Sequence, residues 1–286
     1  MSEANNNKIR IGFIGQGWIG KNYADYFERR NFKVVRYALE EPYRKNKEKI
    51  KDCDIVFIAV PTPTTPEGFD DSIVRNAVAL VGANNIAVIK STVLPGTTKR
   101  VQEKYPDRYV MHCPEFLTEV TVIEDVAHPF HNIIGVPEMT DILRTKAELV
   151  MSILPRVKSE IICLSQEAEL FKYMRNNYLY TKYMFMNIYY DVASAIGADW
   201  NTMQAIMIND PWIGSQGLTP VHKGGRGAGG HCHIKDLAAL RVFAEKIMPE
   251  NKEDIAVLKS LEHLNKKLLK ESGKDLDLLE GVYGKI

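Results

Sequence analysis

The stretch that decides the fold lies near the start of the chain, where residues 9–27 read IRIGFIGQGWIGKNYADYF. A short apolar run gives way to an amphipathic run from Trp18, so we expect a strand followed by a helix. Between them stands Gly15-x-Gly17-x-x-Gly20. In this spacing the first glycine permits a tight turn, the second lets a pyrophosphate approach the backbone, and the third lets helix pack on strand. The motif predicts a dinucleotide site at the helix start; the alternative is an ordinary glycine turn.

The residues up to about 165 alternate between apolar runs and amphipathic runs. Several apolar runs carry no polar residue, as expected for strands that are covered on both faces. Strands that alternate with helices imply crossover connections, so we expect an α/β domain with a Rossmann-type, doubly wound, mostly parallel sheet. The predicted strands are 8–14, 32–39, 54–60, 85–90, 109–113, 132–136 and 160–163, and the predicted helices are 18–29, 71–81, 97–104 and 139–154.

A change of class is predicted near residue 165. Residues 166–196 read as one long helix, shorter helical patterns follow, and strand patterns disappear. We therefore expect a dinucleotide-binding domain over 1–165 and an all-α domain, built on the long central helix, over 166–286. Apolar and aromatic side chains cover nearly the whole circumference of that helix, which predicts burial on all sides, between domains or in a subunit interface.

Composition excludes several classes of protein. The 286 residues carry a net charge of +1, so the chain lacks the electrostatic footprint of a partner for nucleic acid or anionic membrane. Its apolar runs are far shorter than the ~20 residues of a membrane helix. The polar start, residues 1–8, is expected to be a frayed terminus without a signal peptide. Four scattered cysteines without a CxxC pair favour a reducing, cytoplasmic location.

The second half of the dinucleotide motif is less regular. An acidic residue about 20 positions after the glycines usually holds the ribose hydroxyls, and Glu40 stands near that place. Glu40 could instead be a solvated surface carboxylate. Arg36 and Arg44 are close enough in sequence to tolerate a 2′-phosphate. We favour NAD over NADP.

Polar residues follow three predicted strands at the point where each strand ends. They are Pro61-Thr62, Ser91-Thr92 and Pro114-Glu115. Ligands of open α/β sheets bind at the carboxyl ends of strands, so these residues should outline a cleft beside the nicotinamide, although prolines there often only end a strand. Thr92 and Glu115 could orient a water or a hydroxyl. The predicted cofactor residues are Gly15, Gly17, Trp18, Ile19, Gly20, Glu40, Pro61, Thr62 and Thr92.

The long helix carries two polar residues on one face. Lys172 and Asn176 are four residues apart and therefore stack. If buried, they need polar partners, and an ammonium paired with an amide can hold a substrate hydroxyl and later an oxyanion. The alternative is that Lys172 makes an exposed i−3 pair with Glu169.

A glycine-rich loop, residues 224–230, precedes Cys232 and an amphipathic helix predicted from residue 234. A thiol at a helix start tends to ionise because the helix dipole favours the thiolate. Asp236 lies four residues later, on the same side, where it could manage a proton or a water. The histidines on either side of Cys232 point in different directions and lack a second ligand pair, so we expect no metal site.

Taken together, these motifs resemble those of the UDP-glucose/GDP-mannose dehydrogenase family. The matching stretches, in the family's order, are GFIGQGWIG, DIVFIAVPTPT, IKSTVLPGTT, HCPEFLTE, EAELFKYMRNNYLYTK and GGRGAGGHCHIKD. The resemblance implies an NAD-dependent oxidoreductase that converts the primary alcohol of a sugar nucleotide to a carboxylate. It also implies a homodimer formed through the long helix.

The resemblance implies a role for each candidate residue. Cys232 would attack an aldehyde intermediate to give a thiohemiacetal and then a thioester, while Lys172 and Asn176 would hold the oxyanion. Covalent capture keeps the aldehyde from escaping between the two oxidations. The other implied catalytic residues are Asp236 and Thr92, which would handle water, and Glu115 and Glu119, which would act in thioester hydrolysis and substrate binding.

Departures from the family pattern keep two alternatives open. A strand–helix unit is missing between the second and third strands, Ala38 replaces the ribose-binding aspartate, and the family's CFPKD reads CHIKD. The chain also stops where the family's UDP-binding domain begins, so we expect a truncated relative whose chemistry is better supported than its UDP-sugar substrate. One alternative is a single-step hydroxyacid dehydrogenase with Lys172 as its acid or base. The other is a non-catalytic nucleotide-binding relative.

Overall fold

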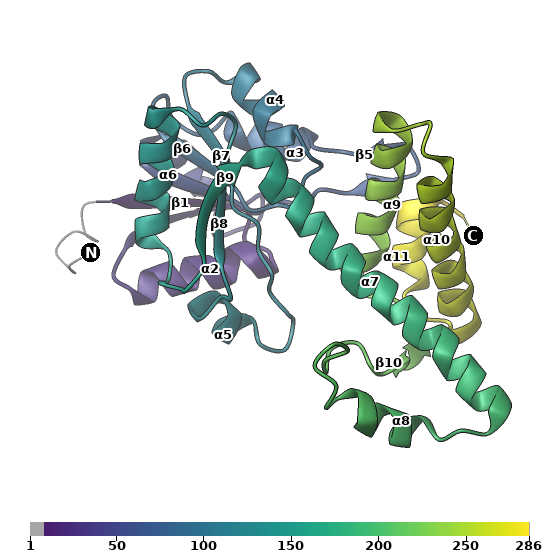
Figure 1. Ribbon diagram of the computed structural model, residues 1–286. Coiled ribbons are helices and arrows are strands. Elements are labelled where there is room, and N and C mark those ends of the chain that lie inside the picture. The colour runs from purple at the N-terminus through teal and green to yellow at the C-terminus, as the bar shows by residue number, and fades with distance from the viewer. Residues whose placement is uncertain (1–8, 286) are drawn as a thin grey trace. The chain divides into compact units, whose positions relative to one another are not determined.

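The computed structural model describes residues 9–285, which fall into two compact units (Figure 1). Unit 1 runs to Thr62 and resumes over Asp70–Lys172, and unit 2 contains Pro63–Phe69 and the chain from Tyr173. The polar start, residues 1–8, lies outside the described residues, so its expected fraying is not addressed. The domain division at residue 165 stays a prediction.

Unit 1 is built on a seven-stranded sheet in the order β2-β1-β3-β6-β7-β8-β9. Neighbouring strands are parallel, except that β8 pairs antiparallel with β7. The sheet confirms the doubly wound, mostly parallel class expected from the apolar runs. Its strands are β1 (Arg10–Ile14), β2 (Lys33–Tyr37), β3 (Ile55–Ile58), β6 (Ile86–Ile89), β7 (Tyr109–His112), β8 (Asn132–Val136) and β9 (Glu160–Leu164).

Helices cover both faces of this sheet. The crossover from β1 to β2 and that from β3 to β6 run in opposite directions, so right-handed connections put α2 and α3 on opposite faces (Figure 1). The core holds stacked rings of Phe13 and Phe57, 5.1 Å apart between centroids, because the register pairs these two residues. The helices are α2 (Trp18–Arg29), α3 (Ser72–Val78), α4 (Thr97–Lys104), α5 (Val122–Ala127) and α6 (Asp141–Ile153).

The sheet ends early beyond β2. The usual Rossmann order carries a further strand there, whereas no strand of residues 9–285 lies beyond β2. The chain between β2 and β3 instead forms the 3-10 helix η1 (Arg44–Asp52). This agrees with the expected loss of a strand–helix unit.

Unit 2 is mainly helical. The long helix α7 (Ser165–Ile196) begins in unit 1 and supplies the apolar side of unit 2, where Tyr180 and Met184 pack with Leu237 and Leu268. A small hairpin over residues 221–226 interrupts the helical pattern that the sequence predicted after residue 165, and a second hairpin, over residues 64–69, joins the unit from the first half of the chain. The other elements of unit 2 are α8 (Trp200–Met207), α9 (Gly230–Ile247), α10 (Lys252–Ser272), α11 (Leu276–Tyr283), β4 (Thr64–Thr65), β5 (Gly68–Phe69), β10 (Val221–His222) and β11 (Gly225–Arg226).

Within the single chain α7 is not buried on all sides, and the prediction that a subunit interface completes its burial stays a prediction. One apolar face is buried, but a second remains exposed, and its members follow one another at helical spacing. Apolar residues around a whole helix do not distinguish the interior of a chain from a surface that another chain covers. The exposed members are Met174, Tyr178, Phe185, Tyr189 and Val192, each 50–63% exposed. None of the helices within residues 9–285 is long and apolar enough to cross a membrane.

Candidate active site

The glycine loop between β1 and α2 has the shape of a phosphate cradle. Gly15 has a φ of +91°, and a Cβ there would lie 2.2 Å from the Ala59 carbonyl oxygen. A Cβ at Gly20 would lie 2.0 Å from the Gly15 carbonyl oxygen, so only glycine fits at either position. A Cβ at Gly17 would meet nothing within 4 Å. The backbone at Gly17 therefore faces open space at the start of α2, where helix N–H groups bind a pyrophosphate.

Arg36, in β2, and Arg44, which follows it, both bind other groups of the protein. Arg36 Nη2 lies 2.6 Å from Asp25 and 2.7 Å from Glu28, and Arg44 Nε donates to the Leu39 carbonyl at 2.5 Å. A guanidinium held by two carboxylates is a poor receptor for a 2′-phosphate, which supports NAD over NADP. Glu40 lies exposed beyond the end of β2, as a ribose-binding carboxylate or a solvated one would.

The carboxyl ends of β3 and β6 are tied together by one serine. Ser91 Oγ accepts from Val60 N at 2.9 Å and donates to Val60 O at 2.7 Å. Beside this link Thr62 is buried, Pro61 is exposed and Thr92 is half-buried. The structure thus places these three predicted residues at adjacent strand ends, with Thr92 accessible to a ligand.

The remaining candidate residues of unit 1 differ in how far their side chains are exposed. Ile19 packs against the core of the sheet, so its side chain is structural. Trp18 is 41% exposed at the start of α2, and Glu119 is exposed.

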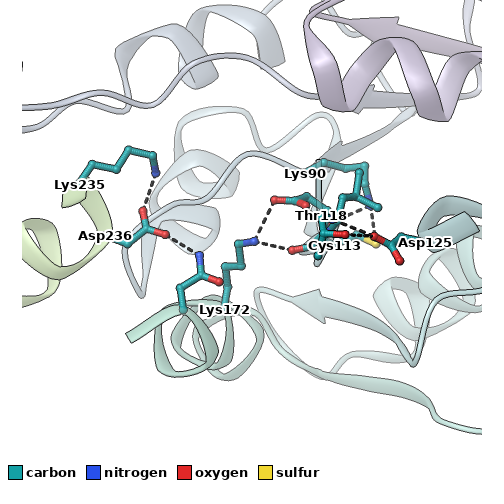
Figure 2. Close-up of polar contacts among 10 residues, drawn as sticks. Lys90, Cys113, Thr118, Asp125, Lys172, Lys235 and Asp236 are labelled. Carbon is teal, nitrogen blue, oxygen red and sulfur yellow. Dashed lines mark hydrogen bonds and ion pairs between the residues drawn. The ribbon is translucent and has the colours of Figure 1, made fainter. Parts of the chain in front are cut away.

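A buried ion pair joins Lys172 of α7 to Glu115. Lys172 Nζ donates to Glu115 Oε1 at 2.9 Å and to the Glu115 carbonyl at 2.5 Å, and both side chains are buried. Burial alone would raise the pKa of Glu115, but the Lys172 ammonium outweighs it and the pKa lies below its usual value. Of the predicted pair on α7, Lys172 therefore has its polar partner on the rim of the sheet (Figure 2).

A second buried polar contact lies in unit 2. Asn176 Nδ2 donates to Asp236 Oδ2 at 2.7 Å, and Lys235 Nζ donates to Asp236 Oδ1 at 2.5 Å (Figure 2). Asp236 is fully buried in α9. The carboxylate is thus held in one orientation by an amide and an ammonium.

Cys232 lies in the first turn of α9, which begins at Gly230, earlier than the start predicted at residue 234. Its side chain is exposed, one helical turn before Asp236. The loop before it is fixed by Asn265, which accepts from Ala228 N at 2.7 Å and donates to Ala228 O at 3.0 Å. The thiol is therefore accessible, and hydrogen bonds fix the backbone of the loop that precedes it.

Glu169 is a site residue that the sequence did not reveal. It is fully buried and accepts from Gly96 N at 2.6 Å, Thr98 N at 2.8 Å and Thr98 Oγ1 at 2.6 Å. Burial, partly offset by these donors, raises its pKa to about 7. Glu169 therefore anchors the loop after Thr92 to α7, and the alternative of an exposed pair with Lys172 is wrong, because both side chains are buried. Two features of the sequence could have indicated this contact. They are the two threonines at a predicted helix start and the glutamate on an otherwise apolar helix.

His112 gives a prediction on stability. It is fully buried in β7, and burial, followed by the charges of Lys90 and Lys172, lowers its pKa to about 3. The unfolded chain protonates near pH 6.5, so this group costs the wild type stability as the pH falls from there toward about 3. We expect His112→Leu to gain about 1.4 kcal/mol relative to the wild type per pH unit in this window.

Urea unfolding at several pH values below neutrality measures this difference. His128→Leu, at an exposed histidine, is the control for replacing an imidazole by leucine. Comparison with the wild type cancels the opposite contribution of Glu169, whose raised pKa favours folding as the pH falls. Parallel loss of stability in His112→Leu and wild type would contradict the assignment.

Two family models match the chain. Residues 41–153 match the NAD binding domain of the UDP-glucose/GDP-mannose dehydrogenase family, and residues 166–267 match the central domain of the same family. The glycine cradle precedes the first matched range, so its geometry is independent support for the dinucleotide.

Individual relatives are named as UDP-glucose 6-dehydrogenases. The UDP-glucose 6-dehydrogenase of Rickettsia bellii is 31% identical over 263 residues, which are 87% of this chain and 58% of that protein. The UDP-glucose 6-dehydrogenase of Pseudomonas aeruginosa is 34% identical over 214 residues, 70% of this chain and 46% of that protein. The chain thus spans about half the length of these two relatives.

A solved structure shares the fold. A UDP-glucose dehydrogenase from the archaeon Pyrobaculum islandicum superposes with a TM-score of 0.78 at 24% identity, over 95% of this chain and 70% of that one.

Proposed function

The chain belongs to the UDP-glucose/GDP-mannose dehydrogenase family, and on this premise we propose that it oxidises the primary alcohol of a sugar nucleotide to a carboxylate through Cys232. The observation that carries the proposal is the buried contact between Asn176 and Asp236. It fixes an amide and a carboxylate one helical turn from an accessible thiol, an arrangement that core packing alone does not need.

The cofactor of the proposed reaction is NAD, which the family's NAD binding domain uses. When bound, NAD⁺ supplies the hydride acceptor. Gly15, Gly17 and Gly20 would hold its pyrophosphate, and Glu40 its ribose. The engaged state of Arg36 disfavours an additional phosphate.

The protein groups would act in a fixed order. The Cys232 thiolate adds to the carbonyl carbon of the aldehyde, so that a carbon–sulfur bond forms while the carbonyl oxygen takes the negative charge. Lys172 and Asn176 would donate to that oxygen. Asp236, Thr92 and Glu115 would position the water that later cleaves the thioester, with Glu119 at the substrate.

The proposed substrate class is a UDP-sugar, since the relatives from Rickettsia bellii and Pseudomonas aeruginosa are named for UDP-glucose. The test mixes the purified chain with NAD⁺ and with UDP-glucose or GDP-mannose, and follows NADH by absorbance and product by mass spectrometry. We expect about two NADH per carboxylate, as covalent capture between two oxidations requires. A single NADH without carboxylate would overturn the cysteine route in favour of a single-step hydroxyacid-type reaction. No turnover, together with no calorimetric binding of NAD⁺, would overturn the enzyme in favour of a non-catalytic relative.

The cradle gives a separate prediction on cofactor affinity. At Gly17 the backbone has a φ of −67° and a ψ of −170°, which any residue adopts, and a Cβ meets no protein atom within 4 Å. We expect Gly17→Val to keep its melting temperature but to weaken NAD⁺ binding at least about tenfold, because the side chain fills the space of the pyrophosphate. Calorimetry and thermal unfolding measure the two effects.

The matched control is Gly281→Ala, whose Cβ also meets no atom within 4 Å and which lies in α11. It should keep both stability and affinity. Undiminished NAD⁺ binding by Gly17→Val would contradict the assignment of the cradle.

We further propose a homodimer formed through α7, because its exposed apolar face is larger than scattered surface residues would produce. We expect the double variant Tyr178→Glu/Phe185→Glu to sediment as a monomer where the wild type sediments as a dimer. Ser260→Glu, on the exposed side of α10, should leave the dimer intact. A wild type that sediments as a monomer at micromolar concentration would contradict the proposal.

A further inference from the structure

A buried lysine–cysteine pair in unit 1 has no part in the reaction proposed above. Lys90 and Cys113 are only 2% and 3% exposed. A lysine is almost never buried to this extent without a partner. Lys90 Nζ donates to both the sulfur and the carbonyl oxygen of Cys113, and the Tyr23 hydroxyl is a further hydrogen-bond partner.

The sheet itself brings the pair together. Ile89 at the end of β6 pairs in register with His112 at the end of β7, so the next residues of both strands stand side by side. Lys90 Nζ lies 3.4 Å from Cys113 Sγ and 3.2 Å from the Cys113 carbonyl oxygen (Figure 2). The ammonium also lies 4.2 Å from the centre of the Tyr23 ring.

This contact favours oxidation of the sulfur. Peroxide oxidises a cysteine sulfur by transferring an oxygen to it, and the Lys90 ammonium, 3.4 Å from Sγ, can donate a hydrogen bond to that oxygen. A cavity lined by Tyr23, Lys90, Cys113 and Glu115 adjoins the pair, so a molecule as small as hydrogen peroxide has a place next to the sulfur.

Oxidation would in turn make the lysine reactive. Burial alone lowers the pKa of Lys90, but the nearby Cys113 and Tyr23 groups outweigh it, so the pKa is raised. Oxidation of the sulfur to an uncharged sulfenic acid removes the Cys113 contribution, the largest of those that oppose burial, while the smaller contributions of Tyr23 and Glu115 remain. The pKa of Lys90 therefore falls and its neutral amine form becomes more populated. A neutral amine beside a sulfenic sulfur is placed to attack it.

We propose that Lys90 and Cys113 form a peroxide-sensitive pair that closes into a covalent bond between Nζ and Sγ. First, peroxide oxidises the thiol to a sulfenic acid and one water leaves. The amine nitrogen then attacks the sulfur, the S–O bond breaks, and the hydroxyl leaves with an amine proton as a second water. Overall, one peroxide is reduced to two waters, and the protein loses two hydrogens.

The bond would act as a reversible lock on the rim of the sheet. It would join Lys90, which precedes Ser91, to Cys113, which lies two residues before Glu115. It would also remove the charge of Lys90. Thiols would reopen it, because an S–N bond is reducible like other sulfenic-acid derivatives. This regulation lies beyond the proposed reaction, and its chemistry does not require that reaction.

Mass spectrometry tests the bond directly. The folded Cys232→Ser variant, which lacks the exposed thiol, is treated with hydrogen peroxide, digested and analysed before and after dithiothreitol. We expect a linked peptide pair containing Lys90 and Cys113, lighter by two hydrogens than the sum of its parts and separated by dithiothreitol. Folded protein should give at least about ten times more link than protein treated in urea, because the fold supplies the proximity.

Internal and matched controls sharpen the result. Burial raises the pKa of Cys53 and of Cys163 to about 11 each, so both should remain thiols under the same treatment. Lys90→Met, without the amine, should give no link. The proposal is overturned if Cys113 stays a thiol, if it accumulates as sulfinic acid without a link, or if denatured protein forms the link equally well. Since the readout is a mass, failure of the sugar-nucleotide reaction would not affect it.

Discussion

Cys232→Ser is expected to abolish carboxylate formation, with a fall of at least about a thousandfold in its rate. Serine has nearly the size of cysteine, but its hydroxyl does not ionise near neutral pH and forms no thioester. The exposed position in the first turn of α9 means that the change should leave the melting temperature unaltered. The measurement is the NADH progress curve together with mass analysis of the sugar product.

Cys163→Ser is the matched control, since Cys163 lies half-buried in β9 and has no proposed part in the reaction. It should keep full activity. If Cys232→Ser turned substrate into carboxylate at the wild-type rate, the thiol would have no covalent role. A variant that instead gave one NADH without carboxylate at the wild-type rate would favour a single-step reaction in which NAD⁺ takes the hydride and Lys172 is the acid or base.

The second large effect is on stability. Lys172→Met should cost about 3–5 kcal/mol of unfolding free energy, because it leaves the Glu115 carboxylate buried without its counter-charge. The lowered pKa of Glu115 depends on Lys172, so that carboxyl should also take up a proton at higher pH in the variant. Urea unfolding followed by circular dichroism measures the loss.

The double variant Lys172→Met/Glu115→Gln separates the ion pair from packing. It removes both charges and should recover most of the loss, since replacing both members of a buried pair is often nearly neutral. Lys182→Met is the control for a lysine on the same helix, where Nζ donates to a backbone carbonyl. A loss below about 1 kcal/mol for Lys172→Met, the size of an exposed pair, would contradict the assignment.

The parts of the fold that were predictable are those that depend on burial along the chain. The strands of unit 1 were recognisable because apolar runs flanked by turn residues have few other interpretations. α2 and α4 have the bounds that were predicted. By contrast, η1 has the polar sequence RKNKEKIKD and a single buried residue, Ile50. It therefore has no apolar periodicity from which a helix could be predicted. The short α5 escaped notice for a similar reason.

The candidate site divides in the same way. Cys232, Asp236 and Asn176 were proposed as site residues from local patterns in a single sequence, and their chemical roles stay predictions. The partners of Glu169 and Lys90 come from distant segments of the chain. Only the folded structure shows which residues these two side chains contact. Glu169 was therefore considered only as a helical neighbour of Lys172.

The β4–β5 hairpin has a consequence for how this molecule is made. Although encoded between two strands of the sheet, it is counted with unit 2, where it packs against α9 and α11. During synthesis, this segment of the helical unit therefore leaves the ribosome long before the rest of the unit. A fragment that begins at residue 166 would lack the segment. Any attempt to express the helical half in isolation should graft the segment 63–69 back, or expect bare apolar surface and precipitation.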